Sequence, residues 1–212
     1  MAEAEFLSHL AQALGRPTPA APATLPDYRL PPRAVDGLDA DHRLNAFVRA
    51  FEAVNGRFLR AHGWDEAAGL VRALLDELGI GESQAAVWSG PELEPLRRIF
   101  PGFYAGGETS EIARRDLGIT WAHAVIAETG TLALLAGPGN ARSTSVLPPV
   151  HLALFSKNEL VGTLGEAFDR LGNQPFRALN FITGPSRTSD IEMDLTIGVH
   201  GPERVIALCL EA

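Results

Sequence analysis

The chain has 212 residues, and 46% of them are apolar, which is enough to bury the core of one large domain. Its formal net charge of −8 excludes a nucleic-acid surface, because phosphate backbones are bound by clustered positive charge. There is no uncharged apolar run of about 18 residues, and the N-terminus carries acids where a secretory signal carries bases, so we expect a cytoplasmic protein.

Two residue types occur once each, and both bear on chemistry. Cys209 is the single cysteine, so this chain cannot hold an iron–sulfur cluster alone, since a cluster usually takes four cysteine ligands. It lies in the apolar segment 205–210, where we expect it to be buried and inert. Lys157 is the single lysine. A Walker-type Gly-Lys pair is therefore absent, and we expect this lysine to be solvated in a polar turn.

The N-terminal segment differs in pattern from the rest. Apolar residues on one side of residues 2–14 predict an amphipathic helix. Residues 16–33 are rich in proline and have no period, which is typical of an extended linker. We therefore divide the chain into an arm, residues 1–40, and an α/β domain, residues 41–212.

Helices and short strands alternate in the next stretch. Apolar residues recur every three or four positions and predict helices over 41–62 and 65–78. Three shorter elements follow, in chain order: a strand over 85–88, a helix over 91–100 with a proline in its first turn, and a helical patch over 111–117.

A long apolar segment, residues 119–127, reads as one strand, and residues 131–136 follow after a turn, which predicts either a hairpin or a strand and its continuation. His123 within this segment is either a pocket residue or a histidine whose ring is satisfied in the sheet, and we favour the second. Glu128 occupies the turn with Thr129 and Gly130. Its carboxylate can serve as a base or nucleophile, or it can cap backbone N–H groups.

Residues 137–142 read Gly-Pro-Gly-Asn-Ala-Arg and begin like a dinucleotide-binding fingerprint. Arg142 stands in place of the third glycine, so a nicotinamide site is disfavoured. Arg142 and the hydroxyl residues after it form either an anion site or a surface loop. A strand over 149–155, a helix over 160–171 and a strand over 178–182 follow.

The residue types of the stretch 181–202 are the ones that packing into a core explains least. Gly184 and Pro185 end the strand and force a turn. A polar cluster then follows: Ser186, Arg187, Thr188, Ser189 and Asp190. Hydroxyls and an arginine fork at a strand end are suited to a carboxylate or phosphate, although such residues also satisfy their own backbone in ordinary turns.

Residues 191–199 alternate between apolar and polar or small positions, including Glu192, which predicts extended chain. His200 stands next to Gly201. It can reach a ligand or shuttle a proton, or its ring can bond a loop carbonyl. Residues 204–210 predict a last strand. The alternation of helices and apolar strands predicts a three-layer α/β protein with a mostly parallel sheet covered by helices on both faces.

Four short segments carry a family resemblance: AETGTL at 127–132, LPPVHLAL at 147–154, GPSRTSDIE at 184–192 and GVHGP at 198–202. They resemble the LUD domain family. The resemblance implies the fold shared by ribose-phosphate isomerases, glucosamine-phosphate deaminases and coenzyme A transferases. It also implies a part in oxidising L-lactate to pyruvate, with iron–sulfur clusters on partner proteins and no cofactor in this chain.

Three hypotheses follow. The first is a subunit that binds a small carboxylate or phosphate, with Arg187, Arg142 or both as its clamp. The second is an enzyme of the isomerase or transferase type, with Glu128 and His200 as its catalytic residues. The third is a regulatory or binding subunit without chemistry, and association with further copies of the chain stays open. No metal is expected. The candidate ligand-binding residues are Thr129, Gly130, Thr131, Arg142, Gly184, Ser186, Arg187, Thr188, Asp190 and Glu192.

Overall fold

The computed structural model describes residues 3–15, 33–189, 195–197 and 201–211, and it divides into two compact units, Met1–Arg33 and Ala34–Ala212. In the first unit, helix α1 (Glu3–Ala13) confirms the expected N-terminal helix. Its apolar side chains are about half exposed: Phe6, Leu7, Leu10 and Leu14. The proline-rich residues 16–32 lie outside the described part of the chain.

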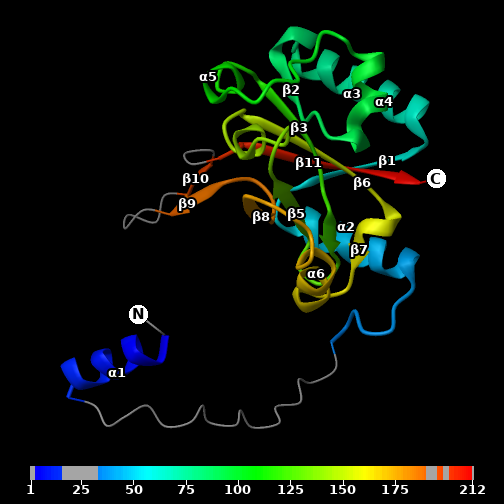
Figure 1. Cartoon of the computed structure of the whole chain (residues 1–212). Coiled ribbons are helices and arrows are strands. Elements are labelled where there is room, and N and C mark those ends of the chain that lie inside the picture. Colours follow the sequence, from blue (N-terminus) through cyan, green and yellow to red (C-terminus); the bar gives the residue numbers. More distant parts are fainter. Residues whose placement is uncertain (1–2, 16–32, 190–194, 198–200, 212) are drawn as a thin grey trace. The chain divides into compact units, whose positions relative to one another are not determined.

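A five-stranded sheet forms the centre of the second unit (Figure 1). All of its neighbouring strands are parallel, which confirms the predicted parallel sheet. In spatial order the strands are β1 (Arg57–His62), β11 (Arg204–Glu211), β6 (Val150–Ser156), β3 (Leu117–Trp121) and β2 (Ala85–Val87). Nearly every residue of β3, β6 and β11 is buried, as expected of parallel strands covered on both faces.

Helices cover the two faces of this sheet (Figure 1). On one face lie α3 (Trp64–Leu78) and α4 (Glu94–Ile99), and on the other lies α2 (Ala40–Ala53). Asp39 caps α2 by accepting a hydrogen bond from the His42 backbone N–H at 2.9 Å. The α2 ring of Phe47 stacks on Phe51 and meets Phe155 of β6 edge to face, so the helix is held to the sheet by aromatic contacts.

A second, four-stranded sheet follows the order β7-β4-β5-β8. Its strands are β7 (Leu160–Val161), β4 (Ala124–Ile126), β5 (Thr131–Ala136) and β8 (Ala178–Ile182). Strands β4 and β5 are antiparallel and form a hairpin, one of the two expected arrangements. One face of this sheet packs on α6 (Leu164–Leu171) through small and branched apolar side chains: Ala124, Ile126, Ala133, Leu135, Val161, Ala167 and Leu171.

Short elements complete the unit. Strands β9 (Arg187–Ser189) and β10 (Leu195–Ile197) pair antiparallel, which agrees with the extended chain expected around them. The short helices are α5 (Thr109–Ile112) and the 3-10 turns η1 (Glu82–Gln84), η2 (Pro91–Leu93), η3 (Arg142–Ser145) and η4 (Lys157–Glu159). No helix among the described residues is long and apolar enough to cross a membrane.

The structure corrects one helix boundary in the first half of the unit. The helix expected over 41–62 ends at Ala53, and residues 57–62 form strand β1. Asn55 adopts a left-handed φ of 68°, which turns the chain. Gly56 lies against the Phe51 ring, where a Cβ would approach to 2.4 Å. Phe58 continues the helical period of apolar residues by coincidence.

Two further elements are divided where one was expected. Residues 119–127 are not one strand, because β3 ends in the parallel sheet at Trp121 and β4 begins in the second sheet at Ala124. Residues 160–171 are not one helix, because Leu160 and Val161 pair with β4 before α6 begins. The helical patch expected over 111–117 is present but shifted, since α5 covers Thr109–Ile112 and Leu117 already begins β3.

Candidate functional site

Two of the segments that carry the family resemblance lie against the C-terminal end of α2 through Gly130 and Gly184, and hydrogen bonds join the described parts of the segments to one another or to residues beside them. Thr131, from the first segment, is hydrogen-bonded to Thr183, next to the third. Ser186 in the third segment donates its backbone N–H to the carbonyl of Pro202 at 2.9 Å. The carbonyl of Pro149, in the second segment, accepts the N–H groups of residues 203 and 204. Segments far apart in sequence are therefore joined by direct hydrogen bonds.

A chain of three hydroxyls forms the centre of this region. The Oγ1 atoms of Thr129 and Thr131 are 2.7 Å apart, and those of Thr131 and Thr183 are also 2.7 Å apart. Thr131 is buried, whereas Thr129 and Thr183 are exposed. Three hydroxyls supply three donors and these two bonds use two, so one O–H group is available to an acceptor from outside.

Two glycines allow the turns to lie directly on α2. Gly130 has φ 65°, and a Cβ there would come within 2.4 Å of the Phe51 backbone nitrogen. Gly184 has φ 87°, and a Cβ there would lie 2.9 Å from the Val54 carbonyl oxygen. Glu128 is exposed beside Gly130, and its backbone N–H donates to the carbonyl of Gly162 at 3.0 Å. We call residues 128–131, 183, 184 and 186 the turn cluster.

A pocket of about 300 Å³ adjoins the turn cluster through Pro185. It lies where β1 and β11 begin, and Arg57 and Arg204 are part of its wall. Arg57 is neutralised by a bidentate pair with Glu77, at 2.7 and 2.9 Å. Arg204 is exposed and makes no ion pair with any described residue. This amino-edge pocket therefore contains one guanidinium, that of Arg204, which is not ion-paired to a described residue, and its wall also includes Glu77 and Glu203.

The predicted site residues divide into four groups. Those of the turn cluster come together as described. Arg142 does not join them, because it follows the far end of β5 from Thr131, a strand length of about 17 Å. For Arg187 and Thr188 the structure describes only the backbone, in β9. Three predicted residues lie outside the described part of the chain: Asp190, Glu192 and His200.

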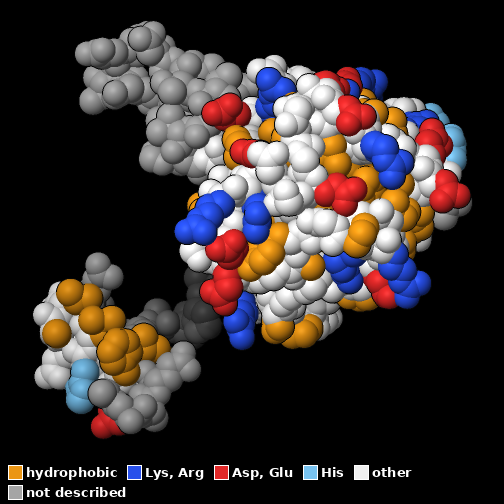
Figure 2. Space-filling model, turned by 90° about the horizontal axis from the view of Figure 1, so that it is seen from above, with side chains coloured by type: hydrophobic (Ala, Val, Ile, Leu, Met, Phe, Trp, Pro, Cys, Tyr) orange, Lys and Arg blue, Asp and Glu red, His pale blue; other side chains and the backbone are white. Residues whose placement is uncertain are grey.

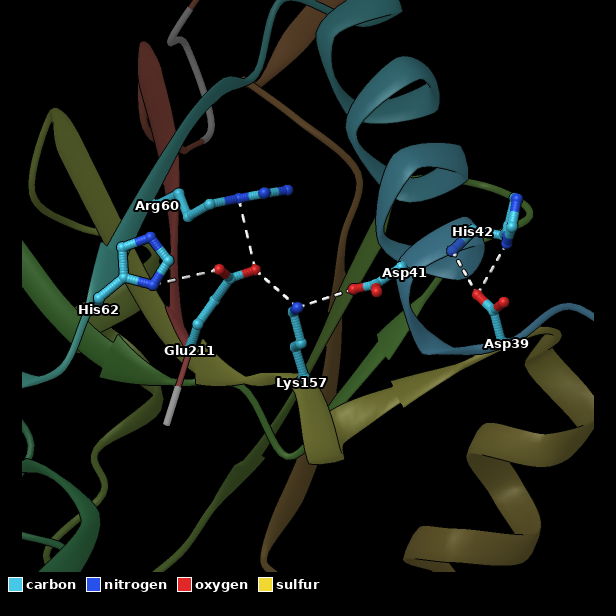
Figure 3. A network of polar contacts seen from close by, with 7 residues as sticks. All are labelled: Asp39, Asp41, His42, Arg60, His62, Lys157 and Glu211. Atoms are coloured by element: carbon cyan, nitrogen blue, oxygen red, sulfur yellow. Dashed lines mark hydrogen bonds and ion pairs between the residues drawn. The ribbon is translucent and has the colours of Figure 1, made fainter.

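At the opposite edge of the parallel sheet, where the strands end, lies a network of charged side chains (Figure 3). Lys157 places its Nζ 2.8 Å from Glu211 Oε1 and 2.7 Å from Asp41 Oδ1. Arg60 Nε and His62 Nδ1 lie 3.5 and 3.4 Å from the same Glu211 carboxylate. The Glu211 side chain is only 11% exposed, and its carboxylate is the shared partner of Lys157, Arg60 and His62.

The pKa shifts in this network assign Lys157 a structural role. Hydrogen bonds to Asp41 and Glu211 raise the pKa of the Lys157 ammonium, and the bond from Lys157 lowers the pKa of Glu211. A more firmly protonated amine is a poorer nucleophile, so the network disfavours Schiff-base chemistry at Lys157. Lys157 lies in a polar turn after β6 and stays partly exposed, as expected, but its ammonium is also held by carboxylates of β11 and α2.

Two histidines lie inside the unit. His123 is half-buried, accepts the Leu135 backbone N–H on Nδ1 at 3.3 Å and lies beside the Trp88 ring, which favours the satisfied histidine over a pocket residue. Burial lowers its pKa. His151 is completely buried in β6, with Nε2 2.8 Å from Thr120 Oγ1. Burial lowers the pKa of His151 to about 3, so its ring is neutral at pH 7.

Charge and metal-ligand placement limit the chemistry further. On the face shown in Figure 2, acidic and basic side chains are interspersed without a continuous basic stretch. Among the residues that the structure describes, no group of three or more His, Cys, Asp or Glu side chains is arranged to hold a metal ion. Cys209 is buried, as expected, and burial raises the pKa of its thiol to about 12.

The sequence analysis missed Thr183, Arg204 and the Lys157 network. Thr183 had one usable signal, because it stands between a strand and the Gly184–Pro185 break, as Thr129 stands beside Gly130. No sequence signal pointed to Arg204, because a charged residue at the start of a strand is common and does not indicate a site.

Comparison with known proteins gives concordant matches. The LUD domain profile matches residues 44–210. Lactate utilization protein C of Halalkalibacterium halodurans is 28% identical over 224 residues, which cover 97% of this chain and 96% of the relative. Lactate utilization protein C of Shouchella clausii is 30% identical over 226 residues, covering 93% and 92%. The crystal structure of a DUF162 family protein from Deinococcus radiodurans superposes with a TM-score of 0.61, at 18% identity, over 82% of this chain and 99% of that one. This last similarity bears on the fold alone.

Proposed function

The chain belongs to the LUD domain family, and from that premise we propose that it is a component of a lactate utilisation system. Relatives that carry the name lactate utilization protein C align along almost their whole length and that of this chain. An alignment of this extent includes every described element of the α/β unit, so the similarity is not confined to one motif.

Within that system, we propose that the turn cluster and the amino-edge pocket bind a small carboxylate such as lactate or pyruvate. The observation that carries this proposal is the Thr129–Thr131–Thr183 hydroxyl chain, which leaves one O–H donor. The adjoining pocket, reached through Pro185, adds Arg204, which is not ion-paired to a described residue. Charge-assisted hydrogen bonds to a carboxylate are stronger than neutral ones. A pocket of about 300 Å³ has room for a three-carbon acid. Arg204, rather than Arg142, is then the described cation at this site.

The oxidation of lactate to pyruvate releases two electrons and two protons. The single Cys209 is buried and cannot supply the ligands of an iron–sulfur cluster. We therefore assign the electron-accepting clusters to iron–sulfur partner proteins and assign binding of the acid to this chain. A role for Glu128 as base in this or another reaction is the alternative, and its exposed position on the turn leaves the side chain accessible to a ligand.

The binding proposal is tested by calorimetric titration of lactate and pyruvate into the wild type, Thr131→Val and Arg204→Gln. We expect each substitution to weaken binding about tenfold or more, because Arg204→Gln removes a charged hydrogen bond and Thr131→Val breaks the hydroxyl chain that orients the remaining O–H donor. Arg49→Gln is the control, since Arg49 is an exposed arginine on α2 outside the site. Equal affinities in all four proteins, or no binding to the wild type, contradict the assignment of this site.

The role in lactate utilisation is tested separately in cells. A lactate-utilising bacterium that lacks its own related subunit is complemented with the wild-type chain, Thr131→Val or Glu128→Gln, and growth on lactate is measured. We expect the wild type to restore growth and Thr131→Val to restore it poorly. Failure of a well-expressed wild-type chain contradicts the role. If Glu128→Gln abolishes growth while the purified variant still binds lactate, the base alternative is supported.

A further inference from the structure

A second pocket, of about 310 Å³, lies at the far end of β5 from the turn cluster. Its wall includes the turn of residues 137–140, which follows β5, and Arg177, which precedes β8. Arg142, at the start of η3, completes the wall. Three separate parts of the chain thus meet around one cavity, namely Gly107, residues 136–142 and residues 177–178, and we call it the two-arginine pocket.

The charge of this pocket is opposite to that of the protein. Its lining contains two guanidinium groups and no carboxylate, in a chain whose formal net charge is −8. Neither Arg142 nor Arg177 makes a side-chain hydrogen bond or an ion pair with the residues that the structure describes. Most other arginines of the α/β unit with a described partner are ion-paired to a carboxylate: Arg43, Arg57, Arg60, Arg98, Arg114, Arg115 and Arg170. The two pocket cations are therefore available to an anion from solution.

The turn beside these cations is held in place by hydrogen bonds from Ser89 and Trp88 to its carbonyl groups. Ser89 donates both its backbone N–H and its hydroxyl to the Gly139 carbonyl, at 2.9 and 3.0 Å. Trp88 Nε1 donates to the Ala141 carbonyl at 2.9 Å. Gly139 has φ 78°, and a Cβ there would lie 2.4 Å from Ser89 Oγ. The wall is thus formed without a ligand, which reduces the ordering cost of binding one.

Asn140 adds a polar group to the wall. Its side-chain oxygen is buried and has no hydrogen-bond partner among the described residues, although it can accept two hydrogen bonds. Asn140 lines the pocket, and its side-chain amide is a group that can hydrogen-bond to a ligand hydroxyl.

We propose that the two-arginine pocket binds the phosphate group of a small hydroxylated phosphate ester. A carboxylate is satisfied by a single arginine fork, whereas a phosphate dianion presents three oxygens and two negative charges and matches two guanidinium groups. The ester's hydroxyls lie near Asn140. This pocket is distinct from the turn cluster, and the proposal does not depend on lactate binding there.

The test is calorimetric titration of glycerol 3-phosphate, inorganic phosphate and glycerol at constant ionic strength. The proteins are the wild type, Arg142→Gln, Arg177→Gln and Arg49→Gln, the last being an exposed arginine outside both pockets with the same change of charge. We expect glycerol 3-phosphate to bind the wild type and Arg49→Gln equally. Each pocket substitution removes charged hydrogen bonds and should weaken binding by about tenfold or more.

Glycerol 3-phosphate should also bind more tightly than inorganic phosphate, and glycerol should not bind. The proposal is overturned if glycerol 3-phosphate does not bind the wild type, if the pocket variants bind as well as the control, or if inorganic phosphate binds as tightly as the ester. Both pocket arginines are exposed, and urea unfolding of each variant verifies that a loss of binding is not a loss of folding. Lactate binding to these variants should equal that of the wild type, which separates this result from the fate of the proposed function.

Discussion

Replacing His151 with glutamine should make the stability of the protein less sensitive to acid. The imidazole is completely buried in β6, and only Nε2 has a partner among the described residues, the hydroxyl of Thr120. Protonation would place a charge in the middle of the sheet, so the folded state keeps the ring neutral. Glutamine does not titrate and can still hydrogen-bond to Thr120.

The sign of the effect follows from the two pKa values. In the folded protein the pKa of His151 is about 3, and in the unfolded chain it is about 6.5. Between these values the unfolded state binds more protons, so the free energy of unfolding rises with pH. The contribution is fully present above pH 6.5 and is lost as the pH falls toward 3. At about 1.36 kcal/mol per pH unit, lowering the pH from 7 to 5 costs about 2 kcal/mol.

Urea unfolding followed by tryptophan fluorescence, at pH 7 and pH 5, measures this cost. The wild type should lose about 2 kcal/mol more than His151→Gln between the two pH values. For each protein, the compared quantity is the difference between its free energies of unfolding at pH 7 and pH 5. A packing defect that destabilises the variant equally at both pH values therefore cancels. Burial also lowers the pKa of His123, which contributes with the same sign in both proteins. Equal losses in the wild type and His151→Gln would refute the reasoning.

Three further predictions concern other parts of the unit. Gly130→Ala should lower the free energy of unfolding by about 3 kcal/mol or more, measured by urea unfolding, because its Cβ would meet the α2 backbone at a positive φ. Lys157→Gln should raise the pH midpoint of acid unfolding, because the lowered pKa of Glu211 supplies stability that is present above the unfolded pKa and lost as the pH falls, and this substitution removes its main cause. An unchanged acid midpoint would mean that the Lys157 network adds nothing to the stability of the folded protein. Cys209 should resist a thiol reagent in the native protein and react in urea, as its burial and the pKa of about 12 require, and rapid labelling of the native form would contradict this.

The parallel sheet was predictable because its strands are buried on both faces, which gives nearly continuous apolar runs such as β6. The hairpin of β4 and β5 was one of the two arrangements that the turn at Gly130 predicted. The sequence did not predict correctly at which residue one element ends and the next begins. The apolar period of α2 runs on past Gly56, whereas the helix ends at Ala53, because Asn55 adopts a left-handed φ and Gly56 lies against the Phe51 ring.

The site was predictable only in part. The motif residues themselves indicate turns at Gly130 and Gly184, and both glycines do adopt positive φ. The hydrogen bond between Thr131 and Thr183 crosses 52 positions, and no local pattern encodes such a contact. Arg142 is the converse case. It is close to Thr131 in sequence but lies beyond the other end of β5, so the two residues are apart in space.

The position of β11 in the sheet affects how the chain folds during synthesis. The strand lies between β1 and β6, and about 140 residues separate the end of β1 from its start. At 5 to 20 residues per second, a ribosome needs roughly 7 to 30 seconds to add them. Throughout that time β1 has no neighbour to accept its backbone hydrogen bonds, and the sheet cannot close. Strand β1 can therefore pair in the sheet only after residues 204–211 have left the exit tunnel.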